Sequence, residues 1–128
     1  SNSLCINYRI FKVTCELEAY LTKIPVKFRT MMIKFRCGNH KLPIVAGRYN
    51  NIDRSDRLCP RCDLQKIGDE YHYLFECPIF EVERKRHLTK QYRKRPNIEK
   101  MNELFNSTNY STMLNLAKFC SLIVRSFS

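Results

Sequence analysis

Residues 58–78 read LCPRCDLQKIGDEYHYLFECP and place three cysteines and one histidine at the spacing Cys59-x2-Cys62-x9-His72-x4-Cys77. A Cys-x2-Cys pair in a tight turn lets both thiolates reach one ion, and three sulfurs with one imidazole suit tetrahedral zinc. Thiolate ligands also favour zinc over magnesium and calcium. The stretch therefore predicts one structural zinc ion held by Cys59, Cys62, His72 and Cys77.

His72 and Cys77 must converge for this site to form, and the residues around them favour that convergence. Asp69 is a good N-cap for about two helical turns over EYHYLFE. Residues five apart diverge in a continuous helix, but Pro78 disfavours helical geometry at Cys77 and lets that side chain turn back. Pro78 then opens the next helix, because proline is favoured at a first helical position.

Two other histidines are weaker ligand candidates, because His40 is distant in sequence and His87 lies well along an expected helix. Four protein ligands leave no open position for the water that a catalytic zinc activates. The acids are scattered, and no glycine-rich phosphate loop occurs, so no hydrolase site is indicated. We expect this chain by itself to have no enzymatic activity.

Outward from the metal candidate, apolar residues at helical spacing indicate a mainly α fold, a small zinc-stabilised helical domain with an irregular centre. The expected helices cover residues 4–24, 28–35, 78–94, 98–105 and 113–127. Gly38 and Asn97 are the expected cap residues. Residues 41–58 lack the helical pattern and are expected to form an extended segment and then a turn-rich loop.

The 128 residues suit a single domain. Its expected parts are N-terminal helices (1–37), a loop (38–58), the zinc knuckle (59–77) and C-terminal helices (78–127). Cys5, Cys15 and Cys120 occupy apolar positions of the helical patterns and are expected to be buried thiols.

The chain carries 23 Lys and Arg residues against 12 acids, a formal charge of +11 at pH 7. A surface this basic favours polyanions as partners, nucleic acid ahead of an anionic membrane. The longest apolar runs are too short to cross a bilayer. An odd number of cysteines without a secretory signal indicates a reducing, intracellular location, in the nucleus, the cytoplasm or both. The missing initial Met suggests a segment of a longer protein.

The metal candidate lies within a longer resemblance. FRCGNHKLPIVAGRYNNIDRSDRLCPRC, IGDEYHYLFECP and the tail STNYSTMLNLAKFCSLIV resemble the segment that follows the polymerase domain of non-LTR (LINE-type) retrotransposon reverse transcriptases. The resemblance covers residues 20–127 and is most specific in GDE-x-H-x-LF-x-CP. It implies that the four residues named above bind zinc. It also implies that the segment grips template RNA or target DNA during target-primed reverse transcription.

Two departures from that family limit the activity that the resemblance implies. An aspartate-rich polymerase motif such as YADD is absent, and RPNIEK lacks the aspartate of a PD-(D/E)-x-K endonuclease cluster. We therefore expect an accessory module of a reverse transcriptase, or a domesticated fragment of one. The polymerase domain of the parent protein is an expected partner.

The expected nucleic-acid contact is the helix PIFEVERKRHLTKQYRKR, which carries seven basic residues against two acids. At helical spacing, one face of it presents Arg86, Lys90, Arg93 and Lys94. Leu88 and Tyr92 point to the other side, where a core can take them. The basic stripe is expected to extend into the loop through Arg48, Arg54, Arg57 and Arg61. The alternative location is the basic set Lys23, Lys27, Arg29, Lys34 and Arg36.

A second interpretation stays open, a structural or protein-interaction zinc domain that docks on a partner. The apolar stripes of the first and last helices exceed what a free zinc knuckle needs. Aromatic side chains that could stack on unpaired bases are Tyr49, Tyr71, Tyr73 and Phe75. Tyr71 and Phe75 are four residues apart, however, and we expect them to pack into the core. The sequence does not distinguish RNA from DNA.

Overall fold

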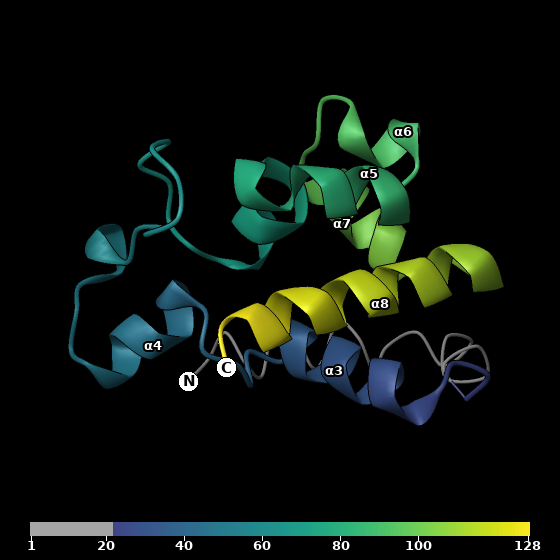
Figure 1. The fold of residues 1–128 in the computed structure, drawn as a ribbon, viewed down its shortest axis with the longest axis horizontal. Coiled ribbons are helices and arrows are strands. Elements are labelled where there is room, and N and C mark those ends of the chain that lie inside the picture. Colours follow the sequence, from purple (N-terminus) through teal and green to yellow (C-terminus); the bar gives the residue numbers. More distant parts are fainter. Residues whose placement is uncertain (1–21) are drawn as a thin grey trace.

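The computed structural model describes residues 22–128, and over these residues the fold is mainly α, as the sequence predicts (Figure 1). The longer elements are α3 (Val26–Arg36), α4 (Pro43–Tyr49), α5 (Glu81–His87), α6 (Lys90–Arg93), α7 (Ile98–Phe105) and α8 (Tyr110–Ser126). Single turns are η1 (Arg54–Asp56), η2 (His72–Glu76) and η3 (Pro78–Phe80). None of the described residues forms a strand, and Leu58 and Ile67 make one antiparallel bridge.

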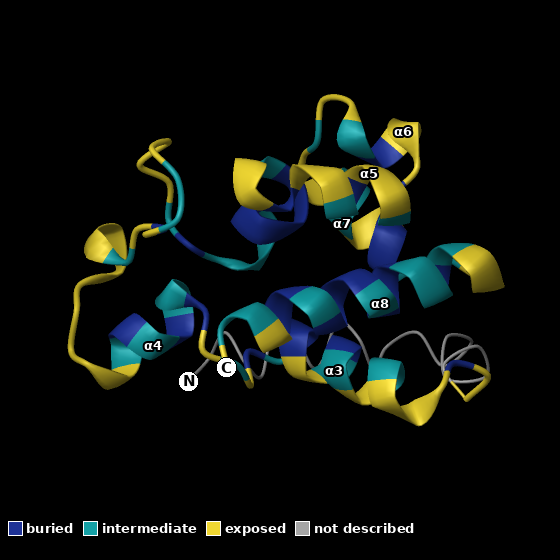
Figure 2. Ribbon diagram, viewed as in Figure 1, coloured by how far each residue is buried: buried dark blue, intermediate teal, exposed yellow. Residues whose placement is uncertain are grey.

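Helix α8 is the centre of the described fold. Helix α3 packs along one side of it, while α5 and α7 pack against it from the other side (Figure 1). Figure 2 shows the buried residues gathered where these helices meet. The fully buried apolar side chains of α8 include Met113, Leu116, Phe119, Cys120 and Ile123. They repeat every three or four residues, so one face of α8 supplies much of the core.

Local sequence signals set several of the helix ends. The Asn97 side chain accepts a hydrogen bond from Lys100 N at 2.8 Å, and the Asn109 side chain accepts one from Thr112 N at 2.9 Å. Both are N-caps that satisfy a free N–H of the first turn. After α3, Gly38 adopts a φ of 73°, a left-handed conformation that costs glycine little. The predicted caps at Gly38 and Asn97 are therefore confirmed.

The expectation of extended and loop structure over residues 41–58 is wrong for the first half of that segment. Residues 43–49 form α4, and residues 54–56 form the single turn η1. Pro43 stands in the first turn of α4, where its missing N–H costs nothing. Val45 and Gly47 are buried, so tertiary packing supports a short helix that has little apolar periodicity.

The expected continuous helix over residues 78–94 is also wrong. The segment forms η3, then α5, and then α6 after an extended break at Leu88, which has φ −114° and ψ 135°. Thr89 also has extended backbone angles, as N-cap residues do. The break lets both Leu88 and Tyr92 reach the core, as expected. It also places Arg86 and Lys90 on different helices, so the predicted four-residue basic stripe does not lie on one helix face.

The predicted helix over residues 4–24 lies outside the described residues, except for its last positions, and so do Cys5 and Cys15. Ile24 is buried and Pro25 precedes the first turn of α3. Among the described helices, none is both long enough and apolar enough to span a bilayer.

Candidate metal centre

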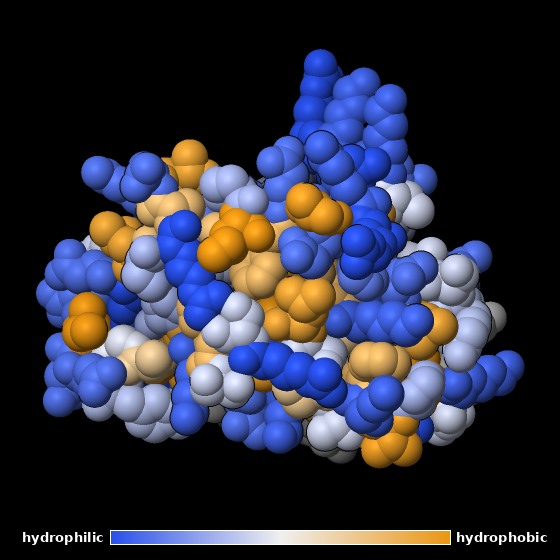
Figure 3. All heavy atoms as spheres, viewed as in Figure 1, coloured by the Kyte–Doolittle hydropathy of each residue, from blue (hydrophilic) through white to orange (hydrophobic). Residues whose placement is uncertain are grey.

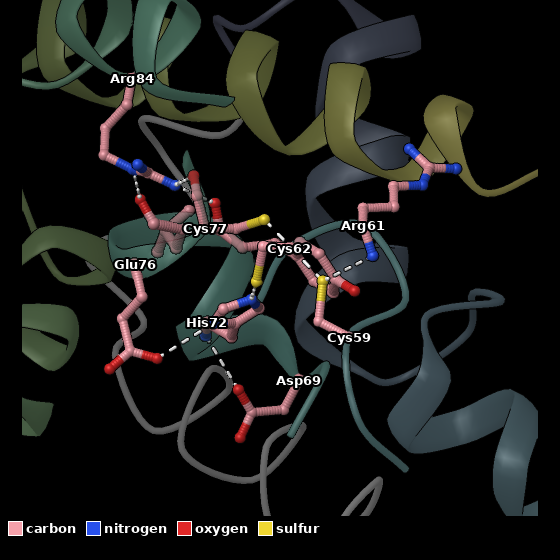
Figure 4. Close-up of polar contacts among 10 residues, drawn as sticks. Cys59, Arg61, Cys62, Asp69, His72, Glu76, Cys77 and Arg84 are labelled. Carbon is pink, nitrogen blue, oxygen red and sulfur yellow. Dashed lines mark hydrogen bonds and ion pairs between the residues drawn. The ribbon is translucent and has the colours of Figure 1, made fainter. Parts of the chain in front are cut away.

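The four predicted ligands lie together in the structure. The ligand atoms of Cys59, Cys62, His72 and Cys77 all lie within 4.8 Å of one another (Figure 4). The sulfurs of Cys59 and Cys77 are 3.9 Å apart, and Cys62 Sγ lies 3.5 Å from His72 Nε2. A tetrahedral site with Zn–S bonds of about 2.3 Å separates neighbouring sulfurs by about 3.8 Å. The group therefore has the spacing of a four-ligand metal centre, and the cysteines are free thiols.

A short knuckle positions the first two ligands. The bridge between Leu58 and Ile67 closes its base, and Cys59 N donates a hydrogen bond to Lys66 O at 2.8 Å. Arg61 N points at Cys59 Sγ, 3.4 Å away. A backbone N–H directed at sulfur favours the thiolate, which is the form that binds metal.

The second pair of ligands is joined by a widened helical turn. Residues 72–76 form a π turn in which Cys77 N donates to His72 O at 2.8 Å. A π turn spans one residue more than an α turn, so side chains five apart come closer to the same face. Cys77 then leaves with φ −64° and ψ 123°, outside the α region. The expected return of Cys77 before Pro78 is confirmed, although the preceding turn is π rather than α.

Two acids orient His72. Asp69 Oδ1 accepts a hydrogen bond from His72 N at 2.8 Å, as its predicted N-cap role requires. Glu76 Oε1 lies 3.1 Å from His72 Nδ1, which leaves Nε2 directed at the cysteines (Figure 4). A carboxylate on the second imidazole nitrogen fixes the tautomer and raises the basicity of the ligand nitrogen. Sequence reasoning missed Glu76, which its position four residues after His72 on one helical turn could have indicated.

The environment of the cysteine thiols shifts their pKa values in different directions. Burial alone would raise the pKa of Cys59, but contacts with the Tyr73 hydroxyl and the Arg61 N–H outweigh it and hold that pKa below its usual value. Tyr73 Oη itself is buried, and no described residue forms a hydrogen bond of full geometry with it. Burial raises the pKa of Cys77 to about 12, and the neighbouring Cys59 thiolate adds to the increase. The negative charge of one thiolate thus disfavours ionisation of the next thiol. A divalent cation bound among them would remove this repulsion.

Arg84 of α5 secures the ligand turn from behind. It is 6% exposed, and its guanidinium donates to the carbonyl oxygens of Leu74 (2.7 Å), Tyr73 and Cys77 (both 2.9 Å). These bonds satisfy carbonyls of the π turn and of a ligand residue. Sequence reasoning assigned Arg84 only to a basic run. The missed signal is that Arg84 lies four residues from both Phe80 and Leu88, on the buried face of the segment.

The two rival histidines have other partners. His40 Nε2 lies 2.7 Å from Glu70 Oε2, and His40 Nδ1 accepts a hydrogen bond from Leu42 N. His87 Nδ1 lies 2.8 Å from Glu83 O, and its ring stacks on Phe119. Neither belongs to the cysteine group, as expected.

The predicted nucleic-acid residues fall into two groups. Four of them are engaged inside the protein: Arg93 donates to Leu88 O, Arg57 to Ile44 O and Ile52 O, Arg61 to Ser126, and Arg48 lies over the Tyr49 ring. The exposed ones are Arg54, Arg86, Lys90 and Lys94. Arg61 also lies 3.8 Å from the ring centroid of Phe127, so it ties the knuckle to the end of α8.

The four aromatic candidates also divide into side chains that pack inside the protein and one that is exposed. Tyr71 and Phe75 pack together with ring centroids 5.2 Å apart, and Tyr73 is fully buried, so the expected packing of Tyr71 and Phe75 is confirmed. Tyr49 is 76% exposed and is the one of these four that a base could stack on in this structure.

No protein-family model matches the chain, and neither a curated protein nor a solved structure matches it. The resemblance to non-LTR reverse transcriptases therefore stays a prediction from the sequence.

Proposed function

We propose that this chain is a structural zinc domain that binds nucleic-acid backbones through exposed basic side chains, as an accessory module of a retroelement reverse transcriptase. The supporting observation is an excess of basic residues, few of which pair with carboxylates within residues 22–128. Between described residues, one ion pair joins a Lys or Arg to a carboxylate, Lys85 with Glu81 at 3.6 Å. Against a formal charge of +11, such a surface attracts a polyanion.

Zinc is the proposed ion because three thiolates and an imidazole form a soft donor set. When bound, it would cross-link the knuckle to the π turn, and four protein ligands would complete a tetrahedral shell. Its proposed role is therefore structural. Three thiolates with a divalent cation sum to −1, so the ion does not create the basic surface.

The exposed basic residues of the α5–α6 region are the proposed contact, and we call Arg86, Lys90 and Lys94 the basic ridge. All three are exposed, and hydrophilic side chains project from this part of the molecule in Figure 3. They belong to α5, to α6 and to the residue after α6. Because Arg93 donates to Leu88 O, it supports the break between the two helices and is left out of the ridge.

Binding as a function of salt tests this proposal. Arg86, Lys90 and Lys94 are replaced together by Gln, and affinity for labelled single-stranded and duplex oligonucleotides is measured by fluorescence anisotropy. The slope of log affinity against log salt should flatten by about two units for single strands and nearly three for duplex DNA. Zinc content should not change.

A charge-matched variant, Lys27, Lys34 and Lys41 to Gln, controls for the general loss of positive charge. All three are exposed, and they lie on or near α3. A larger effect of this control than of the ridge variant would move the contact to the α3 side. Failure of the wild-type protein to bind any oligonucleotide would refute the proposed function.

A second function, docking on a partner domain, is favoured by exposed apolar side chains next to the metal centre. Ile79 and Val82, which follow the ligand Cys77 closely, are 47% and 66% exposed. The wild-type protein would then bind no oligonucleotide, and Val82→Lys would abolish association with a co-expressed polymerase domain.

A further inference from the structure

Arg36, the last residue of α3, is a buried charge for which residues 22–128 provide no hydrogen-bond or ion-pair partner. It is 5% exposed, and its Nε is completely buried. The guanidinium lies over the Phe105 ring, 4.3 Å from the centroid, and forms no hydrogen bond or ion pair with any described residue. Buried charges are normally paired, because removing an ion from water without compensation is costly. Because Arg36 also lines a cavity, a ligand there could supply acceptors to the terminal nitrogens of the guanidinium.

A cavity of about 270 Å³ adjoins this side chain. Arg36 shares its lining with Asp69, Glu70, Tyr71, Met101 and Asn102. The volume lies just below the range of about 300–1,000 Å³ typical of pockets for drug-sized ligands, so it suits one small planar group. Asp69 to Tyr71 lead directly into the ligand His72, so the cavity borders the metal centre.

Each of the two carboxylates in the cavity has one oxygen that can still accept a hydrogen bond from a ligand. Asp69 uses Oδ1 to accept from His72 N, and Glu70 uses Oε2 for His40. Because His40 Nδ1 accepts from Leu42 N, it is His40 Nε2 that carries the proton donated to Glu70. The second oxygen of each carboxylate forms no hydrogen bond with a described residue. The cavity thus offers a guanidinium donor and free carboxylate acceptors together.

This mixture of charges disfavours anions, and a guanidinium donor beside carboxylate acceptors suits a neutral heterocycle that has both acceptors and donors. The carboxylates would repel a phosphate or another anion, and Arg36 would repel a cation. Guanine presents two adjacent acceptors, N7 and O6, which arginine binds in a bidentate manner. Its Watson–Crick edge presents N1–H and the N2 amino group as adjacent donors to a carboxylate. Adenine lacks the paired acceptors and cytosine lacks the paired donors.

We propose that the cavity binds one unpaired guanine base, with Arg36 on its N7 and O6 atoms and Asp69 or Glu70 on its N1 and N2 donors. This inference rests on the proposed nucleic-acid function and names the base that the strand would insert beside the metal centre. Unpaired bases are read at both edges in this way by proteins that bind single strands.

The first experiment uses the wild-type, metal-loaded chain and needs no mutation. Anisotropy measures affinity for a labelled ten-residue thymine strand whose central base is thymine, adenine, cytosine, guanine, 7-deazaguanine or inosine. The guanine strand should bind at least about fivefold more tightly than the adenine strand. 7-Deazaguanine lacks the N7 acceptor and inosine lacks the N2 donor, so each should lose part of the gain. Equal affinity for guanine and adenine strands overturns the guanine site.

The second experiment assigns the selectivity to Arg36. Arg36→Met keeps the length of the side chain and removes its donors, so it should bind guanine and 7-deazaguanine strands equally. Arg125→Met is the matched control, because Arg125 is an exposed arginine in the last turn of α8. It should keep the guanine preference at a slightly lower overall affinity. If Arg36→Met still binds the guanine strand more tightly than the 7-deazaguanine strand, the assignment is overturned.

Guanosine monophosphate is the third probe, and it separates a base site from a strand site. Salt-dependent binding of all strands without guanine preference would leave the proposed function standing and refute this inference. Binding of the nucleotide, but of no strand, would support the guanine site and refute nucleic-acid binding. If neither the nucleotide nor any strand binds, both the guanine site and the proposed function are refuted.

Discussion

Two buried arginines, Arg84 and Arg36, meet different environments in the same small fold. Arg84 lies behind the metal centre and donates to three carbonyl oxygens at 2.7–2.9 Å. Arg36 lies at the end of α3 over an aromatic ring, and its Nε has no acceptor in the described part of the chain. Burial lowers the pKa of both guanidinium groups. Their exposure is nearly equal, so exposure alone does not distinguish a structural arginine from one that awaits a ligand.

The difference lies in the backbone that each arginine faces. The π turn over residues 72–76 and the extended Cys77 direct carbonyl oxygens toward α5, where Arg84 can reach them. Arg36 faces a cavity edged by the side chains of Asp69 and Glu70. Arg84 thus belongs to the architecture of the ligand turn, whereas Arg36 contributes to a surface that a ligand can enter. Three measurements test this difference between Arg84 and Arg36.

The largest effect is expected from removal of the proposed metal ion, which should unfold the turn whose carbonyl oxygens Arg84 binds. Structural zinc sites contribute about 10–16 kcal/mol of apparent binding free energy, against a total stability of about 5–15 kcal/mol for a typical domain. Chelation, or Cys59→Ser, should therefore unfold the chain, as seen by circular dichroism and by elemental analysis. Cys37→Ser is the control, because Cys37 lies outside the ligand group. Well-folded protein without bound metal would contradict the zinc proposal.

The second-largest effect, a loss of folding stability, is expected for Arg84→Met. Hydrogen bonds to charged groups contribute about 1.5–3 kcal/mol each, and the change removes three of them and leaves buried carbonyls unsatisfied. The free energy of unfolding in urea should fall by at least about 3 kcal/mol. Arg86→Met, at an exposed position two residues later, should stay within about 0.5 kcal/mol of the wild type. Similar small losses in both variants would show that Arg84 does not support the ligand turn.

The smallest effect is expected for Arg36→Met. Replacing an unpaired buried charge by an apolar side chain removes its desolvation cost, while the contact with the Phe105 ring is largely kept. The free energy of unfolding should stay within about 1 kcal/mol of the wild type, or rise. Urea denaturation of Arg36→Met and Arg84→Met under identical conditions measures the contrast directly. A loss of stability in Arg36→Met that equals the loss in Arg84→Met would make both arginines structural.

Much of the metal centre follows from residues that are close in sequence. The spacing of Cys59, Cys62, His72 and Cys77 predicts the group that the structure brings together within 4.8 Å. Asp69 and Pro78 predict where the ligand turn begins and where it ends. The π geometry of that turn was not predicted. The hydrogen bonds of a π turn span one residue more than those of an α turn, and the choice between the two depends on packing against other segments, such as α5.

The charged run after Pro78 shows where sequence reasoning fails. Seven basic residues, four of them at helical spacing, predicted one helix with one basic face. In the structure the helix breaks at Leu88, Arg84 turns inward, and Arg93 donates to the backbone. Charge and periodicity are properties of the segment, but the direction of each arginine depends on which carbonyl oxygens the rest of the fold presents.

The mainly α class, the caps at Gly38 and Asn97, the apolar face of α8 and the four residues that could hold a metal ion all follow from the sequence alone. Each of these depends on spacing within a few turns of chain or within a nineteen-residue stretch. Only the tertiary structure decided that Arg84 supports the ligand turn and that Arg36 opens onto a cavity. The physical reason is that a buried guanidinium is stabilised by acceptors from other segments, and those acceptors gain their positions only when the segments pack.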